Sequence, residues 1–407
     1  MTIDEIRYEE ARARLDKALQ QVSAEEIVSA DKALSRISAQ SLASAINLPA
    51  QANAAVDGYC VSSAYLEKHP DHKFTLIGEA KAGHPFTGQL KGGEALWIFT
   101  GAEMPKGADC VMMQEYCERQ GQEVSFPHIM RAGYNVRPAG ENLAKGEEII
   151  AQGEVVTPAH IAQLAAAGLT QIPVRRPLRV GVISTGDELS EGAEKQPLPQ
   201  GQIFDSNRPL LKQLIIQAGH QVVDGGIIGD NLAELTKAYE TLSQNCDAVI
   251  SSGGASQGIE DHSQNAIKAI GAEILFWRVA MKPGRPVGAA MMGGVPLFLL
   301  PGNPVAVFVC FQLFVLPTLF KLSTGVFSPL KQLFIPMGVA LDKKPNERTE
   351  FVRVKLALTN DGDTVMLPHG RKGAGVLSSL TGADGLAELP YEAGTINAGQ
   401  KLPVILL

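Results

Sequence analysis

The spacing of apolar residues changes along the chain and predicts a different kind of structure in each stretch. Near the N-terminus, apolar residues recur at helical spacing between charged ones: Ile3, Ile6, Leu15, Leu19 and Val22. This spacing predicts an amphipathic helix over residues 3–22, and its weaker repeat predicts further helix over residues 24–46. Turn-forming residues over 48–58 end the repeat.

Residues 58–150 consist of short apolar runs separated by frequent Gly, Pro and Asp turns. This texture predicts an all-β segment. Residues 158–168 begin with Pro and finish with Gly, which is typical of a short helix.

From residue 178 to residue 320, apolar strands alternate with helical patterns. The predicted strands are continuously apolar: LRVGVIS, QVVDGGII and DAVISS. The predicted helices follow over residues 205–219, 232–242 and 262–270, and Asp230 is a candidate cap of the second. This alternation predicts a doubly wound, mostly parallel sheet whose strands are buried on both faces.

Polar and apolar residues alternate again after Ser328, most clearly in EFVRVKLAL at 350–358. Further strand patterns near 363–368 and 401–407 predict a small C-terminal β domain. The predicted fold class is therefore multidomain α/β plus β, with the α/β domain at its centre.

The composition supports a folded multidomain protein. Of 407 residues, 45% are hydrophobic and 19% are charged, which excludes disorder as a description of the whole chain. Lys and Arg number 36 against 43 Asp and Glu, and the net charge of −7 argues against general nucleic-acid binding. An anionic small substrate stays open, because local clusters need not follow the net charge.

Cysteine and targeting signals favour a soluble, cytoplasmic protein. The five cysteines form no C-x-x-C pair, so we expect neither a disulfide framework nor a thiolate metal site. The N-terminus is charged and lacks the apolar core of a signal peptide. Val295–Phe320 is membrane-like, but polar and Pro residues interrupt it before the roughly 20 residues that a bilayer requires. We therefore predict no membrane association.

Polar motifs matter most where they end an apolar strand, since ligands of doubly wound sheets bind beyond the carboxyl ends of the strands. STGDEL at 184–189 ends the first strand. It offers the hydroxyls of Ser184 and Thr185 and two carboxylates for a ligand. A turn followed by a helix cap is the alternative.

The glycine loop SSGGASQG at 251–258 ends the third strand. Adjacent glycines let backbone N–H groups approach an anion, and the following helix directs its positive end there. The loop is neither a dinucleotide fingerprint nor a Walker loop, and a plain tight turn is the alternative. Its candidate ligand contacts are Ser251, Gly253, Gly254 and Ser256.

Two further motifs contain proline turns. In KPGRP, Lys282 and Arg285 flank a Pro-Gly turn, which makes a rigid positive corner suited to phosphate or another oxyanion. Two solvated surface cations are the alternative. In LPGNP, Pro301 and Pro304 hold a stiff loop before an apolar helix, either as a ligand contact or as a structural stop.

Three carboxylates are expected at one edge of the sheet: Glu188, Asp230 and Asp261. Taken alone, Asp230 is more typical of a helix cap than of a catalytic acid. Carboxylates beside a phosphate-binding glycine loop are, however, how proteins hold Mg²⁺ against a phosphate. The residues alone therefore predict a multidomain α/β protein that binds an anionic, phosphate-bearing ligand with Mg²⁺.

The β segment adds three polar, turn-rich motifs that hairpin geometry alone would also explain: VDGY at 56–59, FTGAEMPKGAD at 99–109 and NVRPAGEN at 135–142. DSN at 205–207, GIIGD at 226–230 and EFVRV at 350–354 complete the set. In this order and over essentially the whole length, the chain resembles the molybdopterin molybdenumtransferase family of MoeA and the gephyrin E domain.

The resemblance implies a homodimer of four-domain subunits. The elongated N-terminal domain, inserted β domain, molybdopterin-binding α/β domain and barrel-like C-terminal β domain would occupy 1–50 with 143–176, 51–142, 177–328 and 329–407. The active site would lie between the α/β domain of one subunit and the β domain of the other.

The implied reaction is the insertion of molybdate into adenylylated molybdopterin, with release of AMP. Mg²⁺ on the three carboxylates named above would offset the charge of the leaving AMP. The oxyanion would be brought to the dithiolene sulfurs by Lys282, Arg285 and Arg353. Positioning and electrostatics would dominate the catalysis.

The same resemblance assigns roles to the β domain. Asp57 and Thr100 would act from the partner subunit on the shared site, and Arg137 and Asn142 would contact the substrate. An adenylyltransferase of the same pathway and molybdoenzyme maturation proteins are the partners that the family implies.

The chain departs from the family pattern at several positions. The family commonly has Asp, Ser, Met, Asp and Ser where this chain has Ala52, Ala54, Val56, Asn142 and Ala374. The alternative function is therefore a non-catalytic or retuned paralogue that acts as a pterin-binding scaffold. The retained carboxylates favour the enzyme, since a scaffold has no need of them. An enzyme that adenylylates the pterin is disfavoured because the chain has no Walker-type loop.

Overall fold

The computed structural model describes residues 5–192, 198–253, 262–327, 332–371 and 373–407. The chain forms two compact units, one of Met1–Glu26 with Arg175–Leu407 and one of Ile27–Val174. We refer to them as the α/β unit and the β unit. The N-terminal helix α1 (Tyr8–Ala18) is shorter than the predicted 3–22 and packs in the core of the α/β unit. The division into four domains stays a prediction.

A six-stranded sheet lies at the centre of the described α/β unit, in the order β16-β13-β17-β21-β20-β18. Four neighbouring strands are parallel: β16 (Gln221–Ile228), β13 (Arg179–Thr185), β17 (Ala248–Ser252) and β21 (Val295–Leu300). The last two run antiparallel: β20 (Gly288–Met292) and β18 (Glu273–Trp277). The predicted mostly parallel sheet is confirmed.

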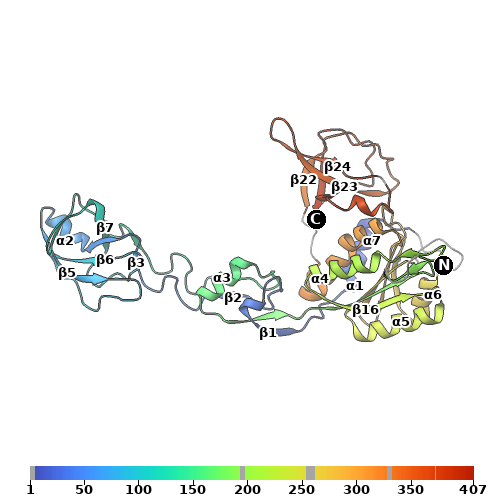
Figure 1. The fold of residues 1–407 in the computed structure, drawn as a ribbon, viewed down its shortest axis with the longest axis horizontal. Helices are drawn as coiled ribbons and strands as arrows, with labels where there is room; N and C mark the ends of the chain where they lie inside the picture. The colour runs from blue at the N-terminus through green and yellow to red at the C-terminus, as the bar shows by residue number, and fades with distance from the viewer. Residues whose placement is uncertain (1–4, 193–197, 254–261, 328–331, 372) are drawn as a thin grey trace. The chain divides into compact units, whose positions relative to one another are not determined.

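Helices cover both faces of this sheet, which makes it doubly wound (Figure 1). One face packs against α1, α4 (Asn207–Gln217), α7 (Pro304–Cys310) and α8 (Leu316–Thr324). The other face packs against α5 (Leu232–Asn245) and α6 (His262–Ala269). Because side chains alternate along a strand, Val182 enters the first core and Ile183 the second. The continuous apolar runs follow from this double burial.

The apolar stretch after β21 forms a helical segment, Pro304–Thr324, with a π turn at Phe311–Val315 between α7 and α8. By length and composition it is the one candidate membrane span in the described residues. Yet 72% of its most apolar window is buried inside the structure, as in a core helix. Phe311, Phe314 and Leu319 are among its residues in the core against the sheet.

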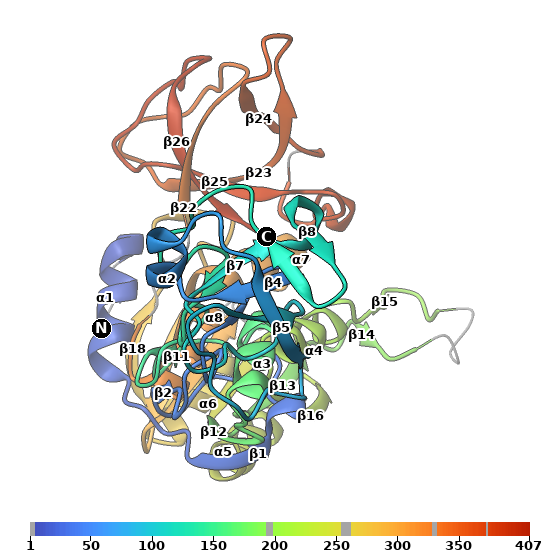
Figure 2. The same ribbon diagram turned by 90° about the vertical axis from the view of Figure 1, so that its left-hand side faces the viewer.

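The C-terminal residues form a second sheet in the order β19-β23-β25-β26-β22, with β24 paired to β23 (Figure 2). Its strands are β19 (Met281–Lys282), β22 (Gln332–Pro336), β23 (Thr349–Leu358), β24 (Thr364–Pro368), β25 (Gly385–Leu389) and β26 (Lys401–Leu406). Gly338 N donates to Met366 O at 2.8 Å, which brings the end of β22 to β24 and curls the sheet. Strand β19 comes from the segment between β18 and β20, so it links the C-terminal sheet to the central sheet.

The β unit contains a six-stranded sheet in its described residues, in the order β7-β4-β6-β5-β9-β8. The strands are β4 (Gly58–Val61), β5 (Phe74–Ala80), β6 (Glu94–Ile98), β7 (Cys110–Met113), β8 (Glu118–Gln120) and β9 (Glu123–Ser125). The predicted β segment is therefore confirmed, with a short α-helix, α2 (Ser63–Lys68), and a 3-10 turn at Gln114–Tyr116 inside it.

The predicted helix over 24–46 is wrong. This stretch contains β1 (Glu25–Ser29), paired in a sheet with β12 (Gln171–Arg175), and β2 (Leu42–Ala43), paired with β11 (Glu148–Ile150). Ile27 and Leu34 are 72% and 50% exposed, so the residues that suggested a helical stripe do not form a buried face. The predicted helix over 158–168 is confirmed as α3 (Pro158–Ala166), with Thr157 and His160 forming a capping box.

Candidate functional site

The parallel strands bring two of the predicted motifs together at a topological switch point. Strand β13 lies between β16 and β17. The chain leaves β13 toward α4 on one face of the sheet and leaves β17 toward α6 on the other face. Ser184 at the end of β13 is in register with Ser252 at the end of β17, and their hydroxyl oxygens are 3.2 Å apart. STGDEL and the glycine loop therefore meet at one edge of the sheet, as the sequence predicted.

The hydroxyls of these strand ends bond within the protein. Tyr239 Oη donates to Ser251 Oγ at 2.9 Å, and Thr185 Oγ1 donates to Ser252 O at 3.4 Å. Ser184, Thr185 and Ser251 are at most 1% exposed, so their side chains hold the strand ends together. Their contacts with a substrate stay predictions.

Gly253 opens the glycine loop in a backbone conformation that favours glycine. Its φ is +93°, and a Cβ at this position would lie 2.2 Å from Thr185 O. Its N–H donates to Leu300 O at 3.2 Å, which ties the loop to the end of β21. The predicted contacts Gly254, Ser256 and Asp261 lie outside the described residues.

The LPGNP loop is held against this edge by Asn207, for which the sequence suggested no role. Asn207 Nδ2 donates to Gly302 O at 2.8 Å, and its Oδ1 is buried without a partner among the described residues. Pro301 follows β21 directly and Pro304 is the first residue of α7, so the two prolines bracket this loop. The DSN motif at the start of α4 is the signal that marks Asn207.

Two of the predicted carboxylates lie in adjoining loops at the same edge. Gly186 N donates to Ile228 O at 3.1 Å, and Asp230 N donates to Asp187 Oδ1 at 3.0 Å, which joins the loops after β13 and β16. The Glu188 side chain folds back over Gly186, since a Cβ added at Gly186 would lie 2.3 Å from Glu188 Oε2. The predicted placement of Glu188 and Asp230 at one edge is therefore confirmed.

Asp230 is not the cap of the following helix. Asn231 caps α5, since its Oδ1 accepts from Ala233 N at 2.9 Å and Glu234 N at 3.1 Å. The cap therefore leaves the Asp230 carboxylate out of the helix start. Within the described ranges, no three His, Cys, Asp or Glu side chains form a metal-binding group. Asp261, the third predicted ligand, is not among those ranges.

The buried Arg208 and three carboxylates form a cluster of ion pairs at the start of α4. Arg208 forms ion pairs with Asp205 at 3.2 Å, with Asp224 at 2.7 Å and with Glu191. Burial alone would lower the pKa of Arg208, but hydrogen bonds to Glu191, Asp224 and Asp205 raise it. Burial would raise the pKa of Asp224, yet hydrogen bonds from Lys212 and Arg208 lower it to about 2. Carboxylates of the protein therefore compensate the positive charge of Arg208.

The two cations of KPGRP point to different partners. Lys282 Nζ lies 3.4 Å from Glu350 of β23, and its side chain is 62% exposed. Arg285 Nε and Nη2 each donate to one carboxylate oxygen of Glu5, both at 2.9 Å. The predicted contact of Arg285 with the substrate stays a prediction, because its fork is paired with Glu5 in this structure.

Lys282 and Arg353 line a pocket of about 220 Å³ between the KPGRP turn and the C-terminal sheet. Pro283, Phe351, His369 and Ala374 are also in its wall. Arg353 is 8% exposed; its Nη2 donates to Arg371 O at 3.1 Å, and its Nε has no acceptor within the described part of the chain. Burial lowers the pKa of Arg353. The pocket thus contains two cations and two carboxylates, those of Asp342 and Glu350. Lys282 is paired with Glu350, whereas Arg353 has no ion pair among the described residues.

Asp57 and Thr100 of the β unit are in direct contact. Asp57 Oδ1 accepts from the backbone N and from Oγ1 of Thr100, both at 2.7 Å. These bonds lower the pKa of Asp57 below its usual range. Gly58, which follows Asp57 and begins β4, leaves no room for a side chain, since a Cβ there would lie 1.9 Å from Met112 O of β7.

Arg137 lies near this pair through strand pairing. Strands β3 (Asn53–Ala54) and β10 (Val136–Arg137) place Arg137 opposite Asn53, and Gly101 N donates to Ala54 O at 2.8 Å on the other side. Asn142 lies apart from them, where its N donates to Leu48 O at 2.9 Å. The structure therefore groups three of the four predicted β-unit residues around β3.

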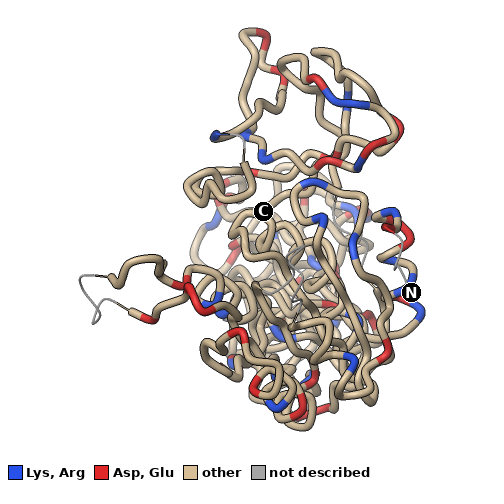
Figure 3. Tube along the Cα trace, turned by 90° about the vertical axis from the view of Figure 1, so that its right-hand side faces the viewer, with Lys and Arg blue, Asp and Glu red and all other residues tan. Residues whose placement is uncertain are grey.

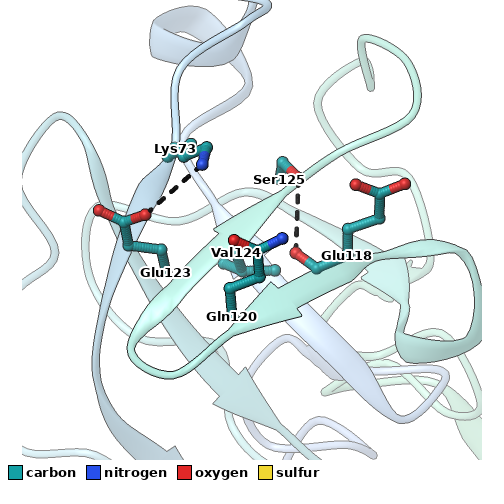
Figure 4. A pocket seen from close by; sticks show the side chains of 6 residues that line it. All are labelled: Lys73, Glu118, Gln120, Glu123, Val124 and Ser125. Carbon is teal, nitrogen blue, oxygen red and sulfur yellow. Dashed lines mark hydrogen bonds and ion pairs between the residues drawn. The ribbon is translucent and has the colours of Figure 1, made fainter.

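A smaller depression elsewhere in the β unit does not involve any predicted site residue (Figure 4). It holds about 50 Å³, Lys73 lies 3.8 Å from Glu123 across it, and Ser125 Oγ donates to Glu118 O. This volume is too small for a nucleotide or a pterin. In the view of Figure 3, acidic and basic residues are interspersed along the trace.

Three family models match successive parts of this chain. The MoeA N-terminal region (domain I and II) matches residues 6–168, the probable molybdopterin-binding domain residues 181–321, and the MoeA C-terminal region (domain IV) residues 337–407. The α/β unit with the switch-point loops thus contains a molybdopterin-binding type of domain.

Individual relatives match over nearly the whole chain. The molybdopterin molybdenumtransferase of Haemophilus influenzae is 32% identical over 391 residues, or 96% of this chain and 92% of that protein. The Nostoc molybdopterin molybdenumtransferase is 33% identical, covering 89% and 84%. A crystal structure of the MoeA protein from Pyrococcus horikoshii is 28% identical, with a TM-score of 0.83 over 99% of both chains.

The chain therefore belongs to the MoeA family of molybdopterin molybdenumtransferases. It is an enzyme of molybdenum cofactor biosynthesis.

Proposed function

We propose that this enzyme inserts molybdate into adenylylated molybdopterin, releases AMP and requires Mg²⁺. The observation that carries the proposal is the pocket with Lys282 and Arg353, because a buried guanidinium that has no anionic partner among the described residues suits a tetrahedral oxyanion. The glycine loop at the switch-point edge would meet the second requirement, a backbone loop for a diphosphate. We also propose that the enzyme works in the cytoplasm and receives its substrate from an adenylyltransferase.

The glycine loop would bind the diphosphate through backbone groups rather than hydroxyls. Ser184 and Ser251 are fully buried and bonded internally, whereas Gly253 keeps a side chain out of the edge. Backbone N–H groups at a loop before a helix are suited to phosphate oxygens. Their contribution is positional, as expected for a reaction with little covalent chemistry for the protein.

Glu188 and Asp230 would hold Mg²⁺, with Asp261 as the third predicted ligand. The donor set fits this ion, since Mg²⁺ binds one or two carboxylates together with substrate phosphates and keeps several waters. The capping of α5 by Asn231 supports it, because Asp230 has no role in that cap. When bound, Mg²⁺ would offset the negative charge that develops on AMP.

The Asp57–Thr100 pair would complete the site from a second copy of the chain. Asp57 is ionised and oriented by its two bonds to Thr100, and Arg137 adds a cation on the neighbouring strand. In a homodimer these residues would reach the switch-point edge of the partner. Asp57→Ala should then abolish transfer while leaving the fold intact.

Mixing two inactive variants tests this shared site. Random exchange between Asp57→Ala and Asp230→Ala subunits makes about half of the dimers mixed, each with one intact site, so about a quarter of wild-type activity should return. Sedimentation of the same samples reports the oligomeric state. A mixture as inactive as its parents, or a clean monomer with full activity, would exclude a site shared between subunits.

The reaction itself is tested by incubating the purified enzyme with adenylylated molybdopterin, molybdate and Mg²⁺. AMP and sulfur-bound molybdenum should appear together, and chelation of Mg²⁺ should stop both. Tight pterin binding without AMP release would instead favour a scaffold or a retuned paralogue. Ala374 gives that second candidate some support, because this apolar residue lines the oxyanion pocket where the family commonly has Ser.

A further inference from the structure

We propose that Glu5 is a positioning residue for oxyanion binding: through Arg285 it fixes the turn at 278–285 and thereby orients Lys282 toward the Arg353 pocket. The inference rests on the proposed function of that pocket. It also assigns Arg285 to holding the turn rather than to the substrate.

The contact between Glu5 and Arg285 joins residues far apart in the sequence in a specific geometry. Both carboxylate oxygens accept from one guanidinium fork, at 2.9 Å each. The side chains are 28% and 36% exposed, so the pair is partly shielded from water. A bidentate Arg–carboxylate pair fixes direction as well as distance, which a single lysine contact would not do.

Backbone bonds next to this ion pair attach the N-terminal segment to the same turn. Ile6 N donates to Arg278 O at 3.3 Å, and Ala280 N donates to Ile6 O at 2.8 Å. Val279 N donates to Arg285 O at 3.0 Å, which closes the turn on itself. The segment that contains Glu5 therefore lies along one side of the turn.

The opposite side of the turn contacts the C-terminal sheet. Thr349 N donates to Ala280 O at 2.9 Å, and Lys282 is paired with Glu350 in the parallel ladder of β19 and β23. Lys282 Nζ lies 3.4 Å from the Glu350 carboxylate. The turn is thus held between the N-terminal segment and the strand that also contains Arg353.

Arg278 shows why this turn needs external support. Its φ is +71°, a left-handed conformation that a non-glycine residue keeps only when neighbouring contacts enforce it. The bond from Ile6 N to Arg278 O is one such contact, and the Glu5–Arg285 pair closes the other end of the turn. Without the carboxylate of Glu5, the turn would lose its charged anchor and Lys282 its fixed direction.

Molybdate titration of the full-length enzyme by calorimetry tests the inference. Glu5→Gln should weaken molybdate binding about fivefold, the effect of one partly shielded ion pair. In steady-state assays the same variant should raise KM for molybdate and leave kcat unchanged at saturation. The exchanged pair Glu5→Arg with Arg285→Glu should restore most of the affinity.

Glu392→Gln is the matched control. Glu392 pairs with Arg7 of the same N-terminal segment at 2.8 Å, and within the described ranges it forms no ion pair with the turn. It should bind molybdate as the wild type does, and both Gln variants, which each lose one ion pair, should show a similarly small decrease in unfolding temperature. A purely structural role of Glu5 would lower the unfolding temperature without changing KM for molybdate.

Lys282→Ala separates this inference from the proposed function. If Lys282→Ala loses molybdate binding while Glu5→Gln binds like the wild type, Glu5 has no positioning role and the pocket assignment stands. If Lys282→Ala also binds like the wild type, the pocket does not take the oxyanion, and the inference is overturned with it.

Discussion

Two buried arginines of the α/β unit differ in what surrounds them. Arg208 is 6% exposed and pairs with three carboxylates, of Asp205, Asp224 and Glu191. Arg353 is 8% exposed, but among the described residues it bonds to the carbonyl of Arg371 and its Nε has no acceptor. The two arginines are therefore buried to nearly the same degree, and they differ in whether carboxylates compensate their positive charge.

The difference separates a structural cation from a binding cation. Carboxylate contacts raise the pKa of Arg208 despite its burial, whereas burial lowers the pKa of Arg353. A buried charge without a partner lowers the stability of the folded state, and an anion that binds it recovers that free energy. Arg353 lines a pocket, and because its Nε is itself buried, an anion in the pocket would reach that atom after a movement of the side chain.

Removal of Arg208 should have the largest effect on folding. Arg208→Met leaves three carboxylates without their shared cation, and we expect a loss of about 3 kcal/mol in the free energy of unfolding. Chemical denaturation measures it. Lys212→Met is the control, because Lys212 contacts the same Asp224 from a more exposed position, and it should cost about 0.5 kcal/mol. Equal losses of stability in the two variants would show that the buried ion pairs of Arg208 stabilise the fold no more than the more exposed pair of Lys212.

Removal of Arg353 should instead affect binding. Arg353→Met should weaken molybdate affinity about 100-fold, the value of charged hydrogen bonds lost from a desolvated site. Stability should stay the same or increase, since a buried uncompensated charge disappears. Titration and denaturation of the same sample give both numbers. Arg371→Met is the control, because the carbonyl of Arg371 and not its side chain contacts Arg353. Loss of stability without loss of molybdate affinity in Arg353→Met would show that Arg353 is a structural cation instead.

The smallest effect concerns pH. The pKa of Asp224 is lowered from 3.8 to about 2 in the folded state, so its contribution is complete above its unfolded pKa. That contribution should disappear as pH falls through the folded pKa, that is, from about 4 to about 2, with a size of about 1 to 2 kcal/mol after allowance for solvent. The stability difference between wild type and Asp224→Asn should shrink across this window. A constant difference would show that Asp224 stays protonated or unpaired.

Much of the fold was predictable because double burial leaves a clear pattern. The strands over 179–185 and 248–252 are continuously apolar, and Pro158 and Gly168 mark the ends of α3 and its following turn. The helix prediction over 24–46 failed because Ala30 and Ala33 are buried at a 3-10 turn while Ile27 is exposed to solvent. Short strands that pair with distant partners leave no comparable local pattern.

The site was predictable as far as chain topology determines it. Parallel strands place Ser184 beside Ser252 without any knowledge of side chains. The distinction between Arg285 and Arg353 was not predictable, because it depends on Glu5, 280 residues away from Arg285. Asn207 was missed because its bond to Gly302 O joins residues 95 positions apart. The sequence favours Asp230 as the cap of α5, but the two hydrogen bonds that cap this helix go to the neighbouring Asn231.

Anomalous diffraction from crystals of the enzyme grown with tungstate tests the central claim most directly. Tungstate has the shape and charge of molybdate, and its metal gives a strong anomalous signal. We predict a tungsten peak in the pocket lined by Lys282 and Arg353, with a tungstate oxygen within hydrogen-bonding distance of the Arg353 guanidinium, and no peak at Arg208. A peak elsewhere, with the Arg353 pocket empty at saturating tungstate, would contradict the account.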